Sequence, residues 1–150
     1  MTDPGSESAY AASLPDDPRG LRLWSISRID IRSPVAPAEW PVARIELVHP
    51  VRGRVTDIGK SPGAFDAAFI AIAQIVGLSP ILLSYCVSSG SIAPDGALTI
   101  CVEVELEMGA HRRRGMSTGV DLVRCSLAAW LDAASKLPVD DHSLPVDPEQ

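Results

Sequence analysis

The chain has no long apolar run, few aromatic residues and only three cysteines. No apolar stretch approaches the roughly 18 residues that a membrane span needs, and aromatic residues make up 5% of the 150 residues. Residues 1–14 lack the basic start and the apolar middle of a secretory signal peptide. Cys86, Cys101 and Cys125 are too widely spaced for a disulfide framework or a metal motif. We therefore expect a cytoplasmic protein with no membrane span, no metal and no cofactor.

The basic residues form no stripe along the folded part of the sequence. The net charge of −6 comes from the two ends, because residues 1–19 carry −3, residues 137–150 carry −4 and residues 20–136 carry about +1. Nucleic-acid binding is therefore not expected. The composition predicts a disordered leader over 1–19, one folded domain over 20–137 and a disordered acidic tail over 138–150.

Residues 20–78 are predicted to form three strands and a helix. Apolar residues occupy both faces at the centre of a strand near 21–31, and they alternate with charged residues over 43–47. A third strand is expected over 51–58. Apolar residues then recur at helical spacing over 65–76, and Gly77 suits a left-handed helix end.

Residues 79–137 repeat this order. Strands are expected over 81–88, over 98–106 and from 111 onward, followed by a helix over 120–134. The segment Gly59-x-Ser61-x-Gly63 recurs as Gly115-x-Ser117-x-Gly119, at an offset of 56 residues. The sequence thus predicts an α+β fold of two tandem βββα units, with helices packed on antiparallel sheets. Such small sheets have open edges, and a homodimer is a common way to cover them.

The repeated glycine and serine segment permits two interpretations. In the first it is a tight loop in which glycine allows the turn and Ser61, Ser117 or Thr118 caps the following helix. In the second the two helix starts also bind an anion such as a carboxylate. A hydrolase nucleophile elbow is disfavoured because the chain is too short for that fold and the motif occurs twice.

The run from Arg112 to Arg114 has a structural interpretation. It should lie across a hairpin from Glu103, Glu105 and Glu107, so that the charges pair within the sheet rather than with a phosphate. Catalysis has weaker candidates in Tyr85, Cys86 and His111, and a pair of Cys101 with His111 across the hairpin is one possibility.

Several of these segments, taken in order, resemble the C-terminal regulatory domain of 2-isopropylmalate synthase and of citramalate synthase. The resemblance covers roughly residues 20–137. It rests on Gly59-Lys60-Ser61-Pro62, Asp66-Ala67-Ala68-Phe69, Leu82-Leu83-Ser84-Tyr85, Asp95-Gly96-Ala97, Gly115-Met116-Ser117-Thr118, Asp121-Leu122-Val123 and Ser126.

The resemblance implies a dimer of paired βββα units that binds a leucine-like amino acid where units and subunits meet. It implies regulation of a synthase barrel, here encoded separately, because the barrel and its metal site are absent from this chain. The ligand-binding residues that it implies are Gly59, Ser61, Gly63, Ala64, Tyr85, Ser117, Thr118 and Gly119.

The sequence departs from the family pattern at the positions that would hold the ligand. Ser61 replaces the usual second glycine of the first loop, Ser84 replaces an aspartate, and each loop carries two extra residues before the helix. An alternative interpretation is therefore an enzyme evolved on this scaffold. It would act on a small carbonyl or carboxylate metabolite between the two units.

Overall fold

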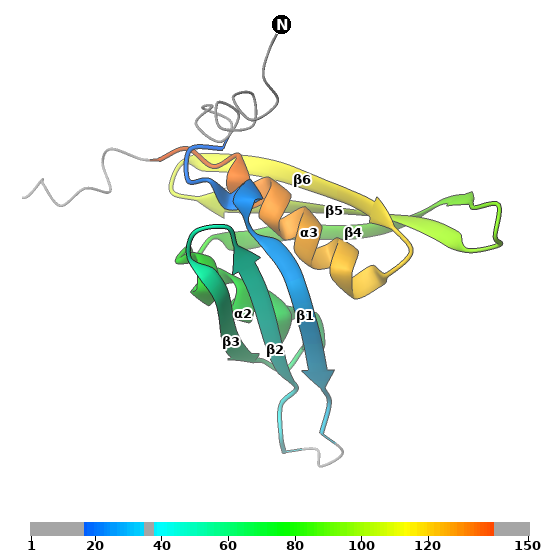
Figure 1. Ribbon diagram of the computed structural model, residues 1–150, viewed down its shortest axis with the longest axis horizontal. Coiled ribbons are helices and arrows are strands. Elements are labelled where there is room, and N and C mark those ends of the chain that lie inside the picture. The colour runs from blue at the N-terminus through cyan, green and yellow to red at the C-terminus, as the bar shows by residue number, and fades with distance from the viewer. Residues whose placement is uncertain (1–16, 35–37, 140–150) are drawn as a thin grey trace, which may run out of the picture.

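The computed structural model describes residues 17–34 and 38–139, which form two βββα units in tandem (Figure 1). In the first unit a 3₁₀ turn, η1 (Leu21–Leu23), precedes β1 (Ser25–Arg32), β2 (Val42–His49), β3 (Gly53–Lys60) and α2 (Ala64–Val76). The second unit consists of β4 (Ile81–Ile92), β5 (Leu98–Met108), β6 (His111–Gly119) and α3 (Leu122–Ser135). Each unit has its own antiparallel sheet, ordered β1-β2-β3 and β4-β5-β6. The predicted α+β class and the repeated βββα order are confirmed.

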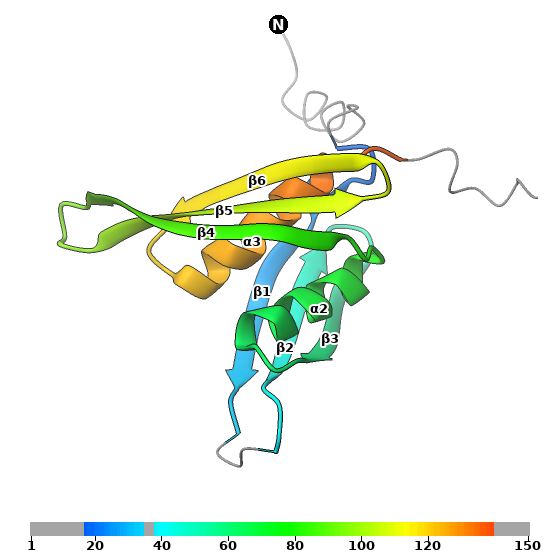
Figure 2. The ribbon, with the colours of Figure 1, turned by 180° about the vertical axis from the view of Figure 1, so that it is seen from behind.

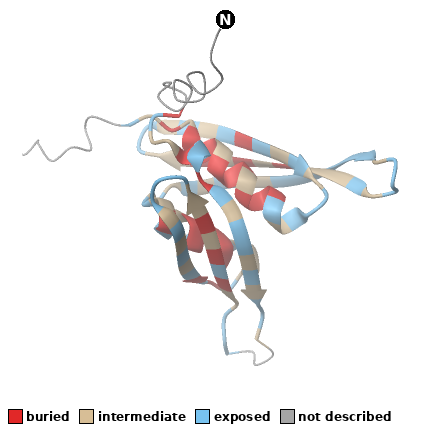
Figure 3. Ribbon diagram, viewed as in Figure 1, coloured by how far each residue is buried: buried red, intermediate tan, exposed pale blue. Residues whose placement is uncertain are grey.

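The middle strand of each sheet supplies the centre of the core. Ala43, Ile45 and Leu47 in β2 are fully buried, as are three alternate residues of β5, namely Val102, Val104 and Leu106. The helix α2 packs on the first sheet and α3 on the second (Figures 1 and 2), and buried residues of strand and helix lie where they meet (Figure 3). The alternation of apolar and charged residues therefore produces sheets with one buried and one solvent-facing side.

Each helix crosses the third strand of its sheet at a glycine. A Cβ atom on Gly59 would overlap the carbonyl oxygen of Ala67 in α2, and a Cβ atom on Gly115 would overlap that of Ala129 in α3. Both glycines have ordinary negative φ angles. They are therefore required for close helix approach and not for a turn, which corrects the loop interpretation of these two positions.

The two units share one core. Tyr85 in β4 lies against the rings of Phe65 and Phe69 in α2, at centroid distances of 5.8 and 6.0 Å. Its hydroxyl lies 2.7 Å from the Ser126 hydroxyl in α3. Trp130, also in α3, is 2% exposed. Aromatic residues thus join elements of both units across the line where α2 and α3 meet.

The chain enters the first sheet through a turn and not through the longer strand that was predicted. Asp17 is buried and its carboxylate accepts hydrogen bonds from the amides of Leu21 and Arg22, at 2.9 and 3.2 Å. The Arg19 guanidinium donates to the carbonyls of Leu137 and Pro138, which follow α3. Residues 1–16 of the predicted leader and 140–150 of the predicted tail lie outside the described residues. No helix in the described part is long and apolar enough to cross a membrane.

Candidate functional site

The two segments that precede the helices differ from each other. Gly59 and Lys60 end β3, and the amide of buried Ser61 donates to the Pro41 carbonyl at 3.3 Å. The cap residue of α2 is Gly63, which offers no side chain. By contrast, Ser117, Thr118 and Gly119 lie inside β6, where they pair with β5.

The predicted serine and threonine caps are therefore wrong. Asp121 caps α3, and its carboxylate accepts a hydrogen bond from the Arg124 amide at 3.1 Å. Ser117 and Thr118 are held in the strand ladder, four and three residues before the cap position. The cap positions, Gly63 and Asp121, are 58 residues apart, so the motif offset of 56 matches the helix-crossing glycines Gly59 and Gly115 but not the helix starts.

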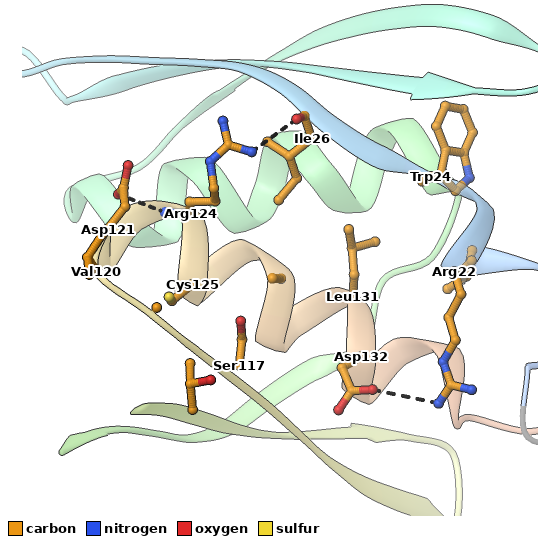
Figure 4. Close-up of a pocket in the computed structure, with 14 residues that line it drawn as sticks. Arg22, Trp24, Ile26, Ser117, Val120, Asp121, Arg124, Cys125, Leu131 and Asp132 are labelled. Atoms are coloured by element: carbon orange, nitrogen blue, oxygen red, sulfur yellow. Dashed lines mark hydrogen bonds and ion pairs between the residues drawn. The ribbon is translucent and has the colours of Figure 1, made fainter. Parts of the chain in front are cut away.

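A groove along α3 brings three of the four predicted ligand residues of the second unit, Ser117, Thr118 and Gly119, together with residues from the first, whereas Tyr85 does not line it. This α3 groove is a cavity of about 570 Å³ between the β6–α3 junction and the η1–β1 segment (Figure 4). Its apolar wall consists of Trp24, Ile26, Cys125, Ala128 and Leu131. Its remaining lining includes Ser117, Thr118, Gly119 and Val120. A ligand here would touch both βββα units.

Charged pairs stand at the two ends of the α3 groove, with Leu131 between them (Figure 4). At one end Arg124 donates to the carbonyl of Ile26 at 3.1 Å, beside Asp121. At the other end Arg22 lies 3.6 Å from Asp132. The Asp132 carboxylate also accepts from the Met116 amide at 3.0 Å and lies 3.3 Å from the Lys136 ammonium.

This distribution of groups suits a small zwitterion with an aliphatic body. Arg124 offers a guanidinium to a carboxylate, and Asp121 offers a carboxylate to an ammonium group. Burial of a branched hydrocarbon chain against the apolar wall would favour binding by about 25 cal/mol for each Å² of apolar surface removed from water. The Asp132 carboxylate already interacts with the Met116 amide, Arg22 and Lys136. The Asp121 end of the groove is therefore better suited to bind the ammonium group of a ligand.

The predicted residues of the first unit do not reach the α3 groove. Ser61 lines a separate cavity of about 730 Å³, between α2, residues 77–80 and Trp130. Gly59 is buried beneath α2, while Gly63 and Ala64 begin that helix. Within one chain the predicted ligand residues therefore lie in separate places rather than in one pocket.

The three catalytic candidates lie apart from one another. Ser126 donates its one hydroxyl hydrogen to the Leu122 carbonyl at 2.8 Å, so the Tyr85 hydroxyl donates to Ser126. Cys86 is exposed on β4 opposite Glu103, and His111 begins β6 opposite Met108. The described residues contain no cluster of three or more side chains that could hold a metal.

The suggested Cys101–His111 pair is wrong. Cys101 pairs with Thr118 across the hairpin, and His111 pairs with Met108. Seven residues along a strand correspond to about 23 Å. The predicted pairing of the Arg112–Arg114 run with the β5 glutamates is confirmed, because Arg112 lies 3.1 Å from Glu107 and Arg114 lies 3.7 Å from Glu103.

Sequence reasoning missed Arg22, Trp24, Ile26 and Arg124 in the α3 groove. One local signal was available for this helix start, since aspartate is a favoured N-cap residue and Asp121 precedes the apolar helix pattern. The approach of residues 22–26 to α3, almost 100 residues further along, has no local signal.

Most of the chain is similar to one part of 2-isopropylmalate synthases. No protein-family model matches the chain. Over 118 residues, or 79% of this chain, it is 31% identical to 2-isopropylmalate synthase of Xanthomonas axonopodis pv. citri (strain 306). Over 119 residues it is 31% identical to 2-isopropylmalate synthase of Stenotrophomonas maltophilia (strain K279a). The aligned region is 21% of the length of each relative. This chain is thus related to a domain-sized part of 2-isopropylmalate synthases and spans about a fifth of their length.

Proposed function

We propose that this chain is a regulatory domain that binds a small branched-chain amino acid, leucine or a close analogue, in the α3 groove. The observation that carries the proposal is the apolar wall of Trp24, Ile26 and Leu131 beside Arg124 and Asp121. The relationship to 2-isopropylmalate synthase supports a ligand from leucine biosynthesis.

In this proposal the ligand carboxylate binds Arg124 and the ammonium group binds Asp121. Ser117, Thr118 and Gly119 form the β6 side of the site. Gly119 lies close to the Cys125 sulfur, since a Cβ atom there would be 2.9 Å away. A side chain at position 119 would therefore enter the groove or displace Cys125.

Regulation follows from the position of the groove between the two units. A ligand that binds one arrangement of η1–β1 against α3 more tightly shifts the population toward that arrangement. We propose that a homodimer of this cytoplasmic chain transmits this shift to a separately encoded synthase barrel. Ser61, Gly63, Ala64 and Tyr85 would contribute through the dimer rather than through the α3 groove, whereas Gly59 would act only by allowing α2 to pack on β3.

Calorimetric titration with leucine, isoleucine, valine and 2-isopropylmalate tests the ligand. We expect saturable heat with one amino acid, and binding at least about tenfold weaker in Arg124→Gln because a charge-assisted hydrogen bond is lost. Gly119→Val should abolish the heat. Arg112→Gln is the matched control, because it removes an arginine outside the groove. The absence of heat with every compound, or an unchanged affinity in Arg124→Gln, would contradict the proposal.

A further inference from the structure

The solvent-facing side of the first sheet carries an excess of positive charge. This arginine face, which is the side of β1–β3 opposite α2, is defined by Arg28, Asp30, Arg32, Arg44, Glu46, Arg54, Thr56 and Lys60. Its five basic and two acidic side chains give a net charge of +3. The described residues as a whole carry only +1. The positive charge is therefore concentrated on one side of one sheet.

Of these five basic groups, only Arg54 forms an ion pair within 4.0 Å in the described part of the chain. Glu46 is already engaged, because it lies 3.3 Å from the Arg54 guanidinium and accepts from Ser27 at 2.8 Å. Arg28 stands opposite Glu46 and Arg44 stands opposite Asp30 in the register. Neither arginine has an ion pair within 4.0 Å among residues 17–34 and 38–139, and the same holds for Arg32 and Lys60.

The outer side of the second sheet shows that this excess is not a general property of the fold. There the β5 glutamates pair with Arg112 and Arg114 of β6. The middle strand β5 carries Glu103, Glu105 and Glu107, whereas the middle strand β2 carries Glu46 alone and Arg44 beside it on the outer side. Ile58 is 45% exposed, so an apolar side chain lies among the unpaired basic groups.

The sequence contains a segment of complementary charge and matching length. Residues 140–150 carry Asp140, Asp141, Asp147 and Glu149, with no lysine or arginine. Leu144 and Val146 stand between the two acidic pairs. From Arg54 to Lys60 the arginine face extends about 20 Å, and residues 141–147 in extended form cover a similar length.

A series of contacts connects residues 137–138, which precede this segment, with the Arg54 end of the arginine face. Arg19 binds the carbonyls of Leu137 and Pro138. Five residues later Trp24 packs against His49, at 4.8 Å between ring centroids, and His49 pairs with Gly53 beside Arg54. The ten steps from Val139 to Glu149 reach about 35 Å when extended, which is longer than the arginine face.

We propose that the acidic segment 140–150 of this chain docks on the arginine face, with Asp147 and Glu149 near Lys60. Docking pairs the arginines that the sheet leaves without partners and covers Ile58 with Leu144 or Val146. Exposed ion pairs are individually weak and are screened by salt, so the contact is a reversible one.

Zero-length carbodiimide cross-linking of the full chain, read by peptide mass spectrometry, tests this contact. The chain has two lysines, Lys60 and Lys136. Lys136 lies 3.3 Å from Asp132, so a Lys136–Asp132 link serves as an internal positive control. We expect Lys60 to link to Asp147 or Glu149 in the monomer fraction, and the yield to fall at about 0.5 M salt, where the screening length is only a few ångströms.

Two matched double variants sharpen the test. Arg28→Gln with Arg44→Gln should reduce the Lys60 link about tenfold, since each exposed pair changes an equilibrium up to about fivefold. Arg112→Gln with Arg114→Gln removes the same charge from the other sheet and should leave the link unchanged. The proposal is overturned if Lys60 forms no link to residues 140–150 while Lys136 links to Asp132. It is equally overturned if Lys60 links to acidic residues of 1–16, or only between different molecules.

Discussion

The two βββα units share their element order and their helix-crossing glycines, but they differ where strand passes into helix. In the first unit β3 ends at Lys60, and Gly63 begins the helix without a side-chain cap. In the second, β6 continues to Gly119 and Asp121 caps the helix. The second junction borders the α3 groove, whereas Ser61 at the first lines a different cavity. Duplication thus preserved the packing core and allowed the two helix starts to diverge.

The largest expected effect tests whether the two units form one cooperative core. Leu47→Ala and Leu106→Ala each remove a fully buried side chain from the middle strand of one sheet. Each should lower the free energy of unfolding by about 2–5 kcal/mol. Because Tyr85, Phe65 and Trp130 join the units, both variants should shift a single transition in denaturant melts. Two separated transitions would show that the units unfold independently.

A smaller effect is expected where the helices cross glycine. Gly59→Ala and Gly115→Ala place a methyl group against helix backbone and should each cost about 2–3 kcal/mol in chemical unfolding. The cost should be larger at Gly115, because all three of its nearest atoms belong to the α3 backbone. Gly63→Ala is the control, since the added atom meets only the flexible Asp66 side chain. Equal stability of Gly115→Ala and Gly63→Ala would contradict this account of the crossings.

The difference between the two helix starts predicts the smallest effect. Asp121→Ala should lower the free energy of unfolding by about 1 kcal/mol because the cap on the Arg124 amide is lost. Gly63→Ser should raise it by a few tenths of a kcal/mol, because it adds an acceptor at an uncapped helix start. Thermal melts of both variants measure this contrast. A stability loss in Asp121→Ala no larger than in Ser117→Ala would argue against Asp121 as the cap.

Regular periodicity made most of the fold predictable. The alternation in Leu98–Leu106 and the helical spacing in 65–76 reflect burial of one face, and both elements form there. The pairing of Arg112 and Arg114 with the β5 glutamates was also predictable. Once the turn of a hairpin is located, it determines which residues face each other across the two strands.

The transitions between elements were less predictable. Gly115, Ser117 and Gly119 have turn propensity, yet pairing with β5 holds them in a strand. Glycine is needed at position 115 of the strand because the backbone of α3 packs directly against it. This is a contact between distant parts of the chain, which local sequence does not reveal. The α3 groove depends on the approach of Arg22, Trp24 and Ile26 to a helix almost 100 residues away, and periodicity carries no information about that contact.

We propose above all that a branched-chain amino acid binds at the second helix start, in the α3 groove. Amide chemical shifts of the isotope-labelled full chain, recorded during a leucine titration, test it most directly. We predict saturable changes at Ser117–Asp121, Arg124 and Ile26, with smaller changes at Ser61–Ala64. Changes confined to Ser61–Ala64, or none at any leucine concentration, would contradict the account.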